Sequence, residues 1–404
     1  MKIALLGVAG GLLFFCGECR AIDIDSFIDG LDERLRLSPF DDKLRARLSG
    51  TFDLEVFHFT DPAPGLIDTT AHNLINPRLT LFLDAQVASQ FYFLGQFRID
   101  RGFDPSDNGV RVSADGYALR LTPWESGIFN LQVGKFATVA GNWVERHLSW
   151  DNPFINAPLA YENVTAISDL ELPYYGLLPS PTQKTKYERL PLIWGPSYAT
   201  GVSIAGSISS YEYAVELKNA ALSSRPGEWD PTRRDFSHPT ITGHVAYQPN
   251  QTWKIGFAGS EGAYLSEAAQ PFLPHGRTIG DYHEFVLGQD ASFAWRHWQV
   301  WAEVYEVRFE VPRVGDVDSL SYYVEIKYKF APQLFAAIRW NQEFFSTIGD
   351  GGSSRSWSPD ISRIEAAVTH RFTANTQLKL QYYIDDQALR GISHTIATQF
   401  TVRF

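Results

Sequence analysis

The sequence has only two cysteines, Cys16 and Cys19, and both fall within its first 21 residues. The chain after residue 19 therefore has no cysteine to form a disulfide, to bind a metal through a thiolate or to act as a nucleophile. The pair does not read as a haem attachment site either, because Arg20 stands where the Cys-x-x-Cys-His motif needs a histidine.

Long hydrophobic runs are equally scarce. Residues 1–21 have the pattern of a secretory signal peptide, with Lys2 before an apolar run over 3–15 and small residues before the expected cleavage after Ala21. The alternative, an N-terminal membrane anchor, needs an apolar run of about 20 residues, and this one is shorter. Beyond residue 21 no apolar run reaches about 18 residues, so we expect no transmembrane helix.

Positive charge is in deficit, with 35 Lys and Arg against 46 Asp and Glu and a formal net charge of −11. This balance argues against nucleic acid as a partner. Residues 22–42 are acidic, with apolar side chains at roughly helical spacing. They predict either a short helix on the periplasmic side or a flexible leader. No linker-like break follows them, so we treat 43–404 as one domain.

From Lys43 onward, charged and apolar residues alternate with a period of two. In residues 322–330, for example, Tyr322, Val324 and Ile326 alternate with Glu325 and Lys327. Successive side chains of a strand face opposite sides, so each such strand has one charged and one apolar face. We predict sixteen strands, over 43–60, 77–88, 91–102, 110–122, 128–136, 197–208, 211–222, 239–248, 252–262, 282–294, 297–310, 320–330, 333–345, 361–371, 377–385 and 392–404.

The predicted connections alternate in length: those after even strands are short, and those after odd strands are long and polar. A soluble β-sandwich or propeller would not need this alternation, nor so many charges on one face of each strand. Together these features predict an all-β fold, a transmembrane antiparallel β-barrel. Aromatic residues near the short turns predict an interfacial girdle, formed by Phe91, Tyr92, Trp124, Tyr211, Tyr247, Trp253, Trp295, Trp298, Phe330 and Phe404.

One connection is far longer than the rest. Residues 137–195 follow the fifth predicted strand and show no sustained strand or helix pattern. A loop of this length in a compact protein is normally functional or disordered. This one is rich in aromatic and aliphatic residues such as Trp143, Trp150, Tyr161 and Trp194, which disordered segments lack. We therefore expect it to pack against something.

The pattern resembles the outer-membrane porins of Gram-negative bacteria. Three features carry the resemblance: sixteen strands, a last strand that ends in Phe404, and the long loop after the fifth strand. The stretches 119–123 and 131–136 look like strands of phosphate-selective-type porins. The resemblance implies that segment 137–195 folds into the barrel as a constriction, and that three copies form a homotrimer. We relate the trimer to the small residues Gly201, Ala205 and Gly206, although these could instead lie beside an inward loop.

The polar strand faces predict a water-filled pore. The charged residues that we expect to line it are Arg45, Arg47, Asp53, Arg78, Asp84, Arg98, Asp100, Arg120, Glu216, Glu325, Lys327, Arg339, Glu343, Arg363, Glu365 and Lys379. Charged rings bias the passage of ions, whereas cross-strand ion pairs only keep the wall hydrated. Both effects are expected. Positive and negative residues are nearly equal in number along the predicted pore, so the sequence does not predict whether anions or cations are favoured.

The long segment adds polar residues of its own. Its candidates for the constriction are Glu145, Arg146, His147, Asp151, Asn152, Asn156 and Glu162. Arg146 would either attract anions or be neutralised by Glu145 or Asp151 and pin the loop to the wall. An unperturbed His147 would titrate near pH 6.5 and tune the balance.

These features predict passive diffusion of small hydrophilic solutes across the outer membrane, with outer-membrane lipid and lipopolysaccharide around the barrel. We expect no cofactor, no metal site and no enzymatic activity, since neither a Gly-x-Ser-x-Gly elbow nor a His-Glu-x-x-His motif occurs. The alternatives are a barrel sheath around a partner protein, as in an electron-transfer conduit, and an outer-membrane hydrolase. An inward loop would argue against the sheath, because it closes the bore.

Overall fold

The structure is a computed structural model that describes residues 30, 34–37, 44–61, 63–67, 69–100, 110–174, 177–179, 186–350 and 353–404. The predicted signal peptide, 1–21, and most of 22–42 lie outside the described residues. Within 22–42, the short strand β1 (Arg36–Leu37) pairs with residues 46 and 47 of the first barrel strand. None of the described helices is long and apolar enough to cross a membrane.

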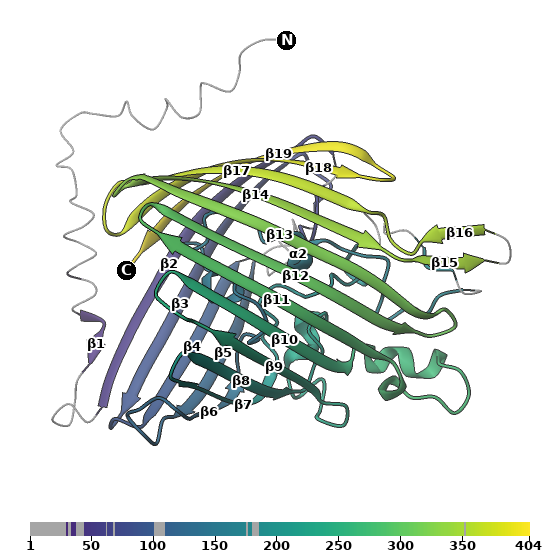
Figure 1. The fold of residues 1–404 in the computed structure, drawn as a ribbon, viewed down its shortest axis with the longest axis horizontal. Coiled ribbons are helices and arrows are strands. Elements are labelled where there is room, and N and C mark those ends of the chain that lie inside the picture. The colour runs from purple at the N-terminus through teal and green to yellow at the C-terminus, as the bar shows by residue number, and fades with distance from the viewer. Residues whose placement is uncertain are drawn as a thin grey trace, which may run out of the picture.

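Sixteen of the described strands close into one antiparallel ring (Figure 1). Each pairs with its neighbour in sequence, and β19 closes the ring by pairing with β2. The barrel strands are β2 (Leu44–Phe59), β3 (Asn73–Val87), β4 (Phe91–Asp100), β5 (Arg111–Leu121), β6 (Asn130–Lys135), β7 (Thr200–Ile208), β8 (Tyr211–Lys218), β9 (Thr240–Tyr247), β10 (Trp253–Ala263), β11 (His283–Trp295), β12 (Trp298–Val311), β13 (Gly315–Ala331), β14 (Leu334–Phe345), β17 (Ile361–Arg371), β18 (Thr376–Gln387) and β19 (Gly391–Arg403). The prediction of a sixteen-stranded antiparallel barrel is confirmed.

The remaining elements are short and lie in the connections. A separate hairpin, β15 (Thr347–Asp350) and β16 (Ser353–Ser356), occupies the loop between β14 and β17. The helical turns are η1 (Val144–Arg146), α2 (Leu159–Glu162), η2 (Lys186–Glu188), η3 (Pro226–Trp229), η4 (Glu267–Phe272) and η5 (Ile279–Asp281).

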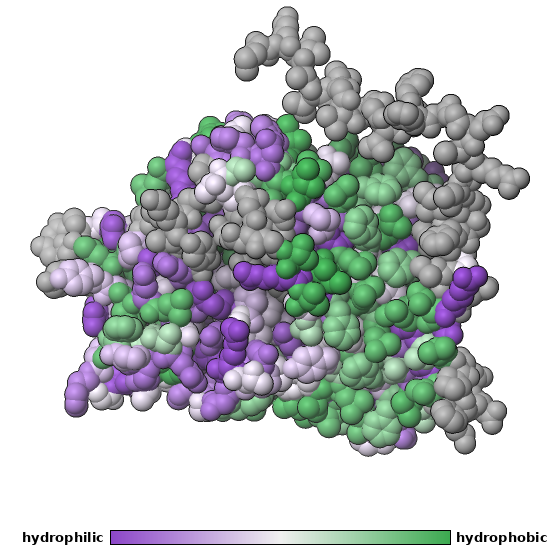
Figure 2. Space-filling view, turned by 180° about the vertical axis from the view of Figure 1, so that it is seen from behind, coloured by the Kyte–Doolittle hydropathy of each residue, from purple (hydrophilic) through white to green (hydrophobic). Residues whose placement is uncertain are grey.

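The period-two alternation divides each strand into an outer and an inner face. On β13, Val324 is exposed, whereas its neighbours Tyr323 and Glu325 are buried. The exposed side chains form a hydrophobic band over the part of the wall nearest the short turns (Figure 2). This is the surface that a barrel presents to lipid, and the polar side chains on the other face point into the lumen.

Toward the long-loop end the polarity of the two faces is reversed. On β12, Glu306 and Arg308 point outward, whereas Val307 and Phe309 point inward and are buried. Figure 2 shows the same change as hydrophilic residues covering the end of the molecule away from the hydrophobic band. Here the strands extend beyond the lipid-facing band, and their inner faces pack on loop residues.

This reversal explains an error in the predicted connections. We expected long loops over 311–319 and 386–391, but β12 and β13 are joined by three residues and β18 and β19 by three residues. The strands simply continue beyond the lipid-facing band. The short connections predicted after even strands are confirmed.

The predicted aromatic girdle is confirmed for most of its members. Trp124, Trp295 and Phe330, for example, are each more than half exposed near the short turns. Tyr92 is an exception, because its pairing partner Gln86 faces the lumen and its hydroxyl donates to Asp84 inside the barrel. The C-terminus also lies at the short-turn end (Figure 1).

Candidate functional site

The described residues of segment 137–195 pack against inward-facing side chains of the wall strands. Its Trp143, Tyr161 and Trp194 belong to a buried cluster that also contains Tyr305 and Phe309 of β12. Helix α2 contacts β13 and β14. Burial of apolar side chains is the main source of stability for a loop that has no regular backbone hydrogen bonds to a neighbouring strand.

The first polar anchor is the carboxylate of Glu303 on β12. It accepts hydrogen bonds from the backbone N–H groups of Asn142 (2.5 Å) and Trp143 (2.7 Å) and from the hydroxyl of Tyr161 (2.7 Å). The turn requires Gly141, whose φ is +82° and whose missing Cβ would lie 2.1 Å from the hydroxyl of Tyr305. Three hydrogen bonds to one buried carboxylate fix the start of the segment.

The second anchor is Arg146, which is buried. Its guanidinium donates to Glu325 on β13 (2.5 Å) and to the hydroxyl of Tyr323 (3.1 Å), and it stacks over Trp301 at 4.2 Å. Burial opposes the charged form, but Glu325, Tyr323 and Glu303 together outweigh it and raise the pKa of Arg146. Of our two expectations, the geometry supports the pinned arginine. The partner that we had named was wrong, because Glu325 takes the place of Glu145 or Asp151.

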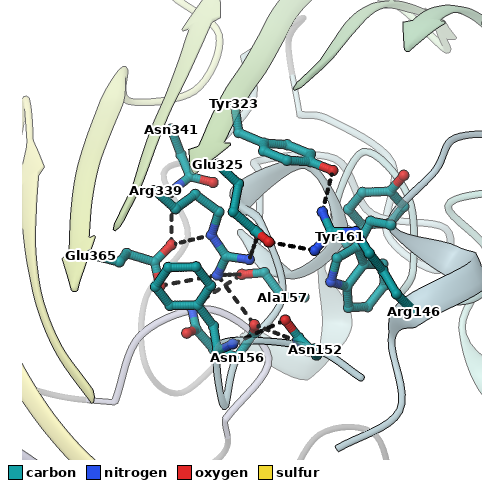
Figure 3. A network of polar contacts seen from close by, with 12 residues as sticks. Arg146, Asn152, Asn156, Ala157, Tyr161, Tyr323, Glu325, Arg339, Asn341 and Glu365 are labelled. Carbon is teal, nitrogen blue, oxygen red and sulfur yellow. Dashed lines mark hydrogen bonds and ion pairs between the residues drawn. The ribbon is translucent and has the colours of Figure 1, made fainter. Parts of the chain in front are cut away.

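The third anchor is Arg339 on β14, whose side chain is fully buried. It binds Glu365 through two hydrogen bonds of 2.8 and 3.0 Å and bridges to Glu325. It also donates to the backbone carbonyls of Asn156 (3.2 Å) and Ala157 (3.1 Å), as Figure 3 shows. The network therefore runs unbroken from Arg146 across β13, β14 and β17 and back to the segment.

Further contacts extend this attachment along the wall. Glu162 pairs with Arg363 on β17, and burial raises the pKa of Glu162 although Arg363 opposes this. Asn163 donates to Glu343 on β14. Lys379 on β18 donates to the carbonyl of Ser149. Asn152 stays within the segment, where it donates to the carbonyl of Asn156.

His147 departs from its expected behaviour. Its Nδ1 donates to the carbonyl of Val144 (2.6 Å), and its Nε2 accepts from the hydroxyl of Tyr198 (2.7 Å), so the neutral ring satisfies both partners. Burial lowers the pKa of His147 to about 4, with Arg98 and Arg78 adding to the effect. The expectation of a titration near pH 6.5 is wrong, because the ring is enclosed.

The two remaining acidic candidates of the segment, Glu145 and Asp151, are exposed. Glu145 lies 3.6 Å from Lys254 on β10, and Lys254 makes a shorter contact of 2.8 Å to Glu212. Asp151 points to solvent near the short-turn end.

The segment leaves a cavity of about 150 Å³ against the opposite wall. That wall is formed by β2 to β5 and β19, and its lining includes Asp53, Glu55, Arg78 and Arg98. Arg78 pairs with both Asp53 and Glu55, and Arg98 pairs with Asp100 and Asp115. His147 and Asn156 line the cavity from the side of the segment.

The predicted pore-lining residues thus fall into three groups. Six lie under or beside the segment and are buried: Glu216, Glu325, Arg339, Glu343, Arg363 and Glu365. Lys379 is also buried there. Asp53, Arg78, Arg98 and Asp100 lie on the opposite wall. Arg45, Arg47, Asp84, Arg120 and Lys327 lie closer to the short-turn end, where Asp84 faces Arg47 across β2 and β3.

Several residues of the site did not stand out in the sequence. The hydroxyls of Tyr305 and Tyr323 and the ring of Trp301 contact residues of the segment, yet in the sequence they looked like ordinary core residues. Gly141 and its neighbours matched no known motif, although an isolated glycine in an aromatic stretch is a signal for close backbone approach.

Fold and geometry define a closed sixteen-stranded barrel of the outer-membrane type. No family model and no curated protein sequence matches the chain. Several solved structures are similar to it in fold. Salmonella typhi OmpF in complex with daunomycin aligns with 91% of this chain and 100% of its own, at 13% identity and a TM-score of 0.58. The anion-selective porin from Comamonas acidovorans aligns with 89% and 100%, at 9% identity and a TM-score of 0.56.

The outer membrane channel DcaP of Acinetobacter baumannii is similar too, over 91% of this chain and 100% of its own, at 10% identity and a TM-score of 0.55. At these identities the likeness is one of fold. The resemblance to porins is confirmed at that level, and the narrower likeness to phosphate-selective porins stays a prediction.

Proposed function

We propose that the protein is an outer-membrane porin, a passive channel for small hydrophilic solutes, and not an enzyme. The observation that carries the proposal is the binding of segment 137–195 to the polar inner face over β12 to β18, with a cavity left along β2 to β5. Such a segment acts as a constriction, since solutes would pass between it and the opposite wall. The hydrophobic outer band fits outer-membrane lipid and lipopolysaccharide.

Planar-bilayer recording of the purified protein tests the proposal. We expect stepwise, ohmic conductance of a narrow pore, absent from detergent alone and from heat-denatured protein. Repeated reconstitutions of folded protein without conductance would overturn it.

The alternative of a sheath around a partner protein is less well supported. A sheath needs a free bore and free wall side chains, whereas Arg339 and Glu325 already bind the segment. For a hydrolase we find no support in the geometry. Among the described residues there is no group of three or more His, Asp, Glu or Cys that could hold a metal ion.

We further propose a homotrimer, supported by a structural neighbour, the trimer form of OmpT from Vibrio cholerae, at 10% identity and a TM-score of 0.55. The small residues that suggested a trimer contribute less than we expected. Gly201 pairs with Lys218 and Ala205 with Ala214, and both partners are buried on the inner face, so only Gly206 of the three faces outward. Native mass spectrometry showing only monomer in mild detergent would count against the trimer.

A further inference from the structure

A second cavity, of about 350 Å³, lies on the lumen side of the short turns that join β11 to β12 and β13 to β14. Lys327 and Lys329 of β13 and Arg371 of β17 line it, together with Arg296, His297 and Gln299. None of the described residues that line this cavity is acidic. In a chain with a net charge of −11, such a concentration of positive charge is local and specific.

The cations around this cavity are held by neutral groups. Lys327 lies 4.3 Å from the ring of Phe335. Arg371 donates to the carbonyl of Trp150 at 3.2 Å and stacks on its ring, whose other contact is Arg403 at 4.1 Å. Within the described part of the chain, no side-chain carboxylate lies within ion-pair distance of Lys327, Lys329, Arg371 or Arg403.

The nearby acids do not neutralise this charge. Glu325 interacts with Lys327 but is already bound by Arg146 and Arg339. Asp151 is one exposed carboxylate whose field reaches Lys327, Arg371 and Arg403. Like charges that are partly buried together repel one another, and an anion relieves this repulsion.

We propose that the short-turn mouth of the lumen contains a binding site for anions with several oxygen atoms, such as phosphorylated or polycarboxylate solutes, formed by Lys327, Lys329 and Arg371 with Arg403 behind them. Lys327, Lys329 and Arg371 come from two strands and converge on one cavity, which suits an anion with more than one charged group. The inference rests on the proposed channel function for its purpose, since it names the class of solute that the lumen favours. Binding itself is measurable without conductance.

The test is equilibrium binding of inorganic pyrophosphate and of citrate to the purified protein in detergent at low salt, with glucose as a neutral probe. The variant K327Q/K329Q/R371Q removes three positive charges from the site. Its matched control, R233Q/R277Q/R308Q, removes three from exposed positions at the long-loop end. We expect a loss of affinity of at least tenfold for both anions in the first variant, a change of less than twofold in the control, and no saturable binding of glucose.

Equal affinities in wild type and K327Q/K329Q/R371Q, or equal losses in both triple variants, would overturn the site. If only one anion binds, the site is specific for phosphate or for carboxylate groups. Should the triple variant fail to fold, K329Q alone changes one exposed side chain, and an affinity loss of about threefold is expected. Anion binding without bilayer conductance would overturn the proposed channel and support the anion site. Conductance without anion binding would support the channel and overturn the anion site.

Discussion

The two halves of the lumen wall use their charges differently. On β12 to β14, β17 and β18 the inward-facing charged residues away from the short turns are buried, and most of their partners belong to segment 137–195 or to the adjacent strand. On β2 to β5 the ion pairs join residues of neighbouring wall strands and line a cavity. The same alternation of polar and apolar residues produced both walls.

This difference separates two roles that a pore-lining charge can have. A charge under the segment stabilises the position of the loop, and its removal leaves a partner buried and unpaired. A charge on the open wall faces the cavity, and its removal changes the electrostatic potential that a passing ion meets. Substitutions on the covered wall should therefore change stability first, and those on the open wall should change selectivity first.

The largest effect is expected for Arg339→Ala on the covered wall. Arg339 is fully buried, and its loss leaves the buried carboxylate of Glu365 without its cation and removes one donor from each of two backbone carbonyls of the segment. We expect the free energy of unfolding, measured by urea titration in detergent micelles, to fall by about 3–5 kcal/mol. An effect no larger than that of Arg308→Ala, which is exposed on the outer face, would contradict this account.

The next prediction concerns Gly141, which places the segment on Glu303. In Gly141→Ala the new Cβ meets the hydroxyls of Tyr305 and Tyr161 at 2.1 and 2.5 Å, in addition to the strain of a positive φ. We expect a loss of about 3 kcal/mol and a larger, noisier single-channel conductance. Gly276→Ala is the matched control, because it has a similar φ of +79° with nothing within 4 Å of the added atom. It should cost only about 1 kcal/mol and leave conductance unchanged.

The barrel could be predicted from the sequence because the pattern that specifies it lies within each strand. Lipid outside and water or polar groups inside impose a period of two, and each strand from Leu44 to Arg403 carries that pattern in its own residues. The ends of the strands were not readable in the same way. Beyond the lipid-facing band the two faces of the strands exchange polarity, so we predicted a loop over 311–319, where β13 in fact begins at Gly315.

The site could be predicted only in part, because the residues that pair in it are far apart in the sequence. Arg146 and Glu325 are 179 residues apart, and Arg339 and Asn156 are 183 apart. The sequence showed that these residues are polar and inward-facing. It could not show which charge neutralises which, because that depends on the path of a segment without strand or helix pattern.

A smaller effect is expected from pH. The pKa of His147 is lowered to about 4 in the folded protein and lies near 6.5 when unfolded. The unfolded state therefore binds the extra proton first, so stability falls as the pH falls from about 6.5 to about 4. Thermal unfolding of wild type and His147→Gln across this range isolates the contribution. We expect the difference in Tm between them to change over this window and to stay constant above pH 7; a constant difference throughout would show that His147 is not held neutral.

A change in selectivity is expected for Arg78→Gln on the open wall. Arg78 lines the cavity and balances Asp53 and Glu55, so its loss leaves excess negative charge there. The reversal potential in a salt gradient should shift toward cations. Arg146→Gln, in the segment where it binds Glu325 of the covered wall, should destabilise the protein without a shift of similar size. If Arg146→Gln gave the larger shift in a folded channel, the comparison of the two walls would be reversed.

The most direct measurement compares two buried, inward-facing threonines, one on each wall. Thr80 lies on β3 and lines the cavity, whereas Thr369 lies on β17 beside Lys379, which is bound to the segment. Each is replaced by cysteine in a C16S/C19S background, and the reconstituted channel is exposed to a small, charged methanethiosulfonate reagent. We predict that modification of Thr80→Cys reduces the conductance, whereas Thr369→Cys is unaffected. Block through Thr369→Cys with no effect at Thr80→Cys would contradict the claim that the segment closes one side of the lumen and leaves the other open.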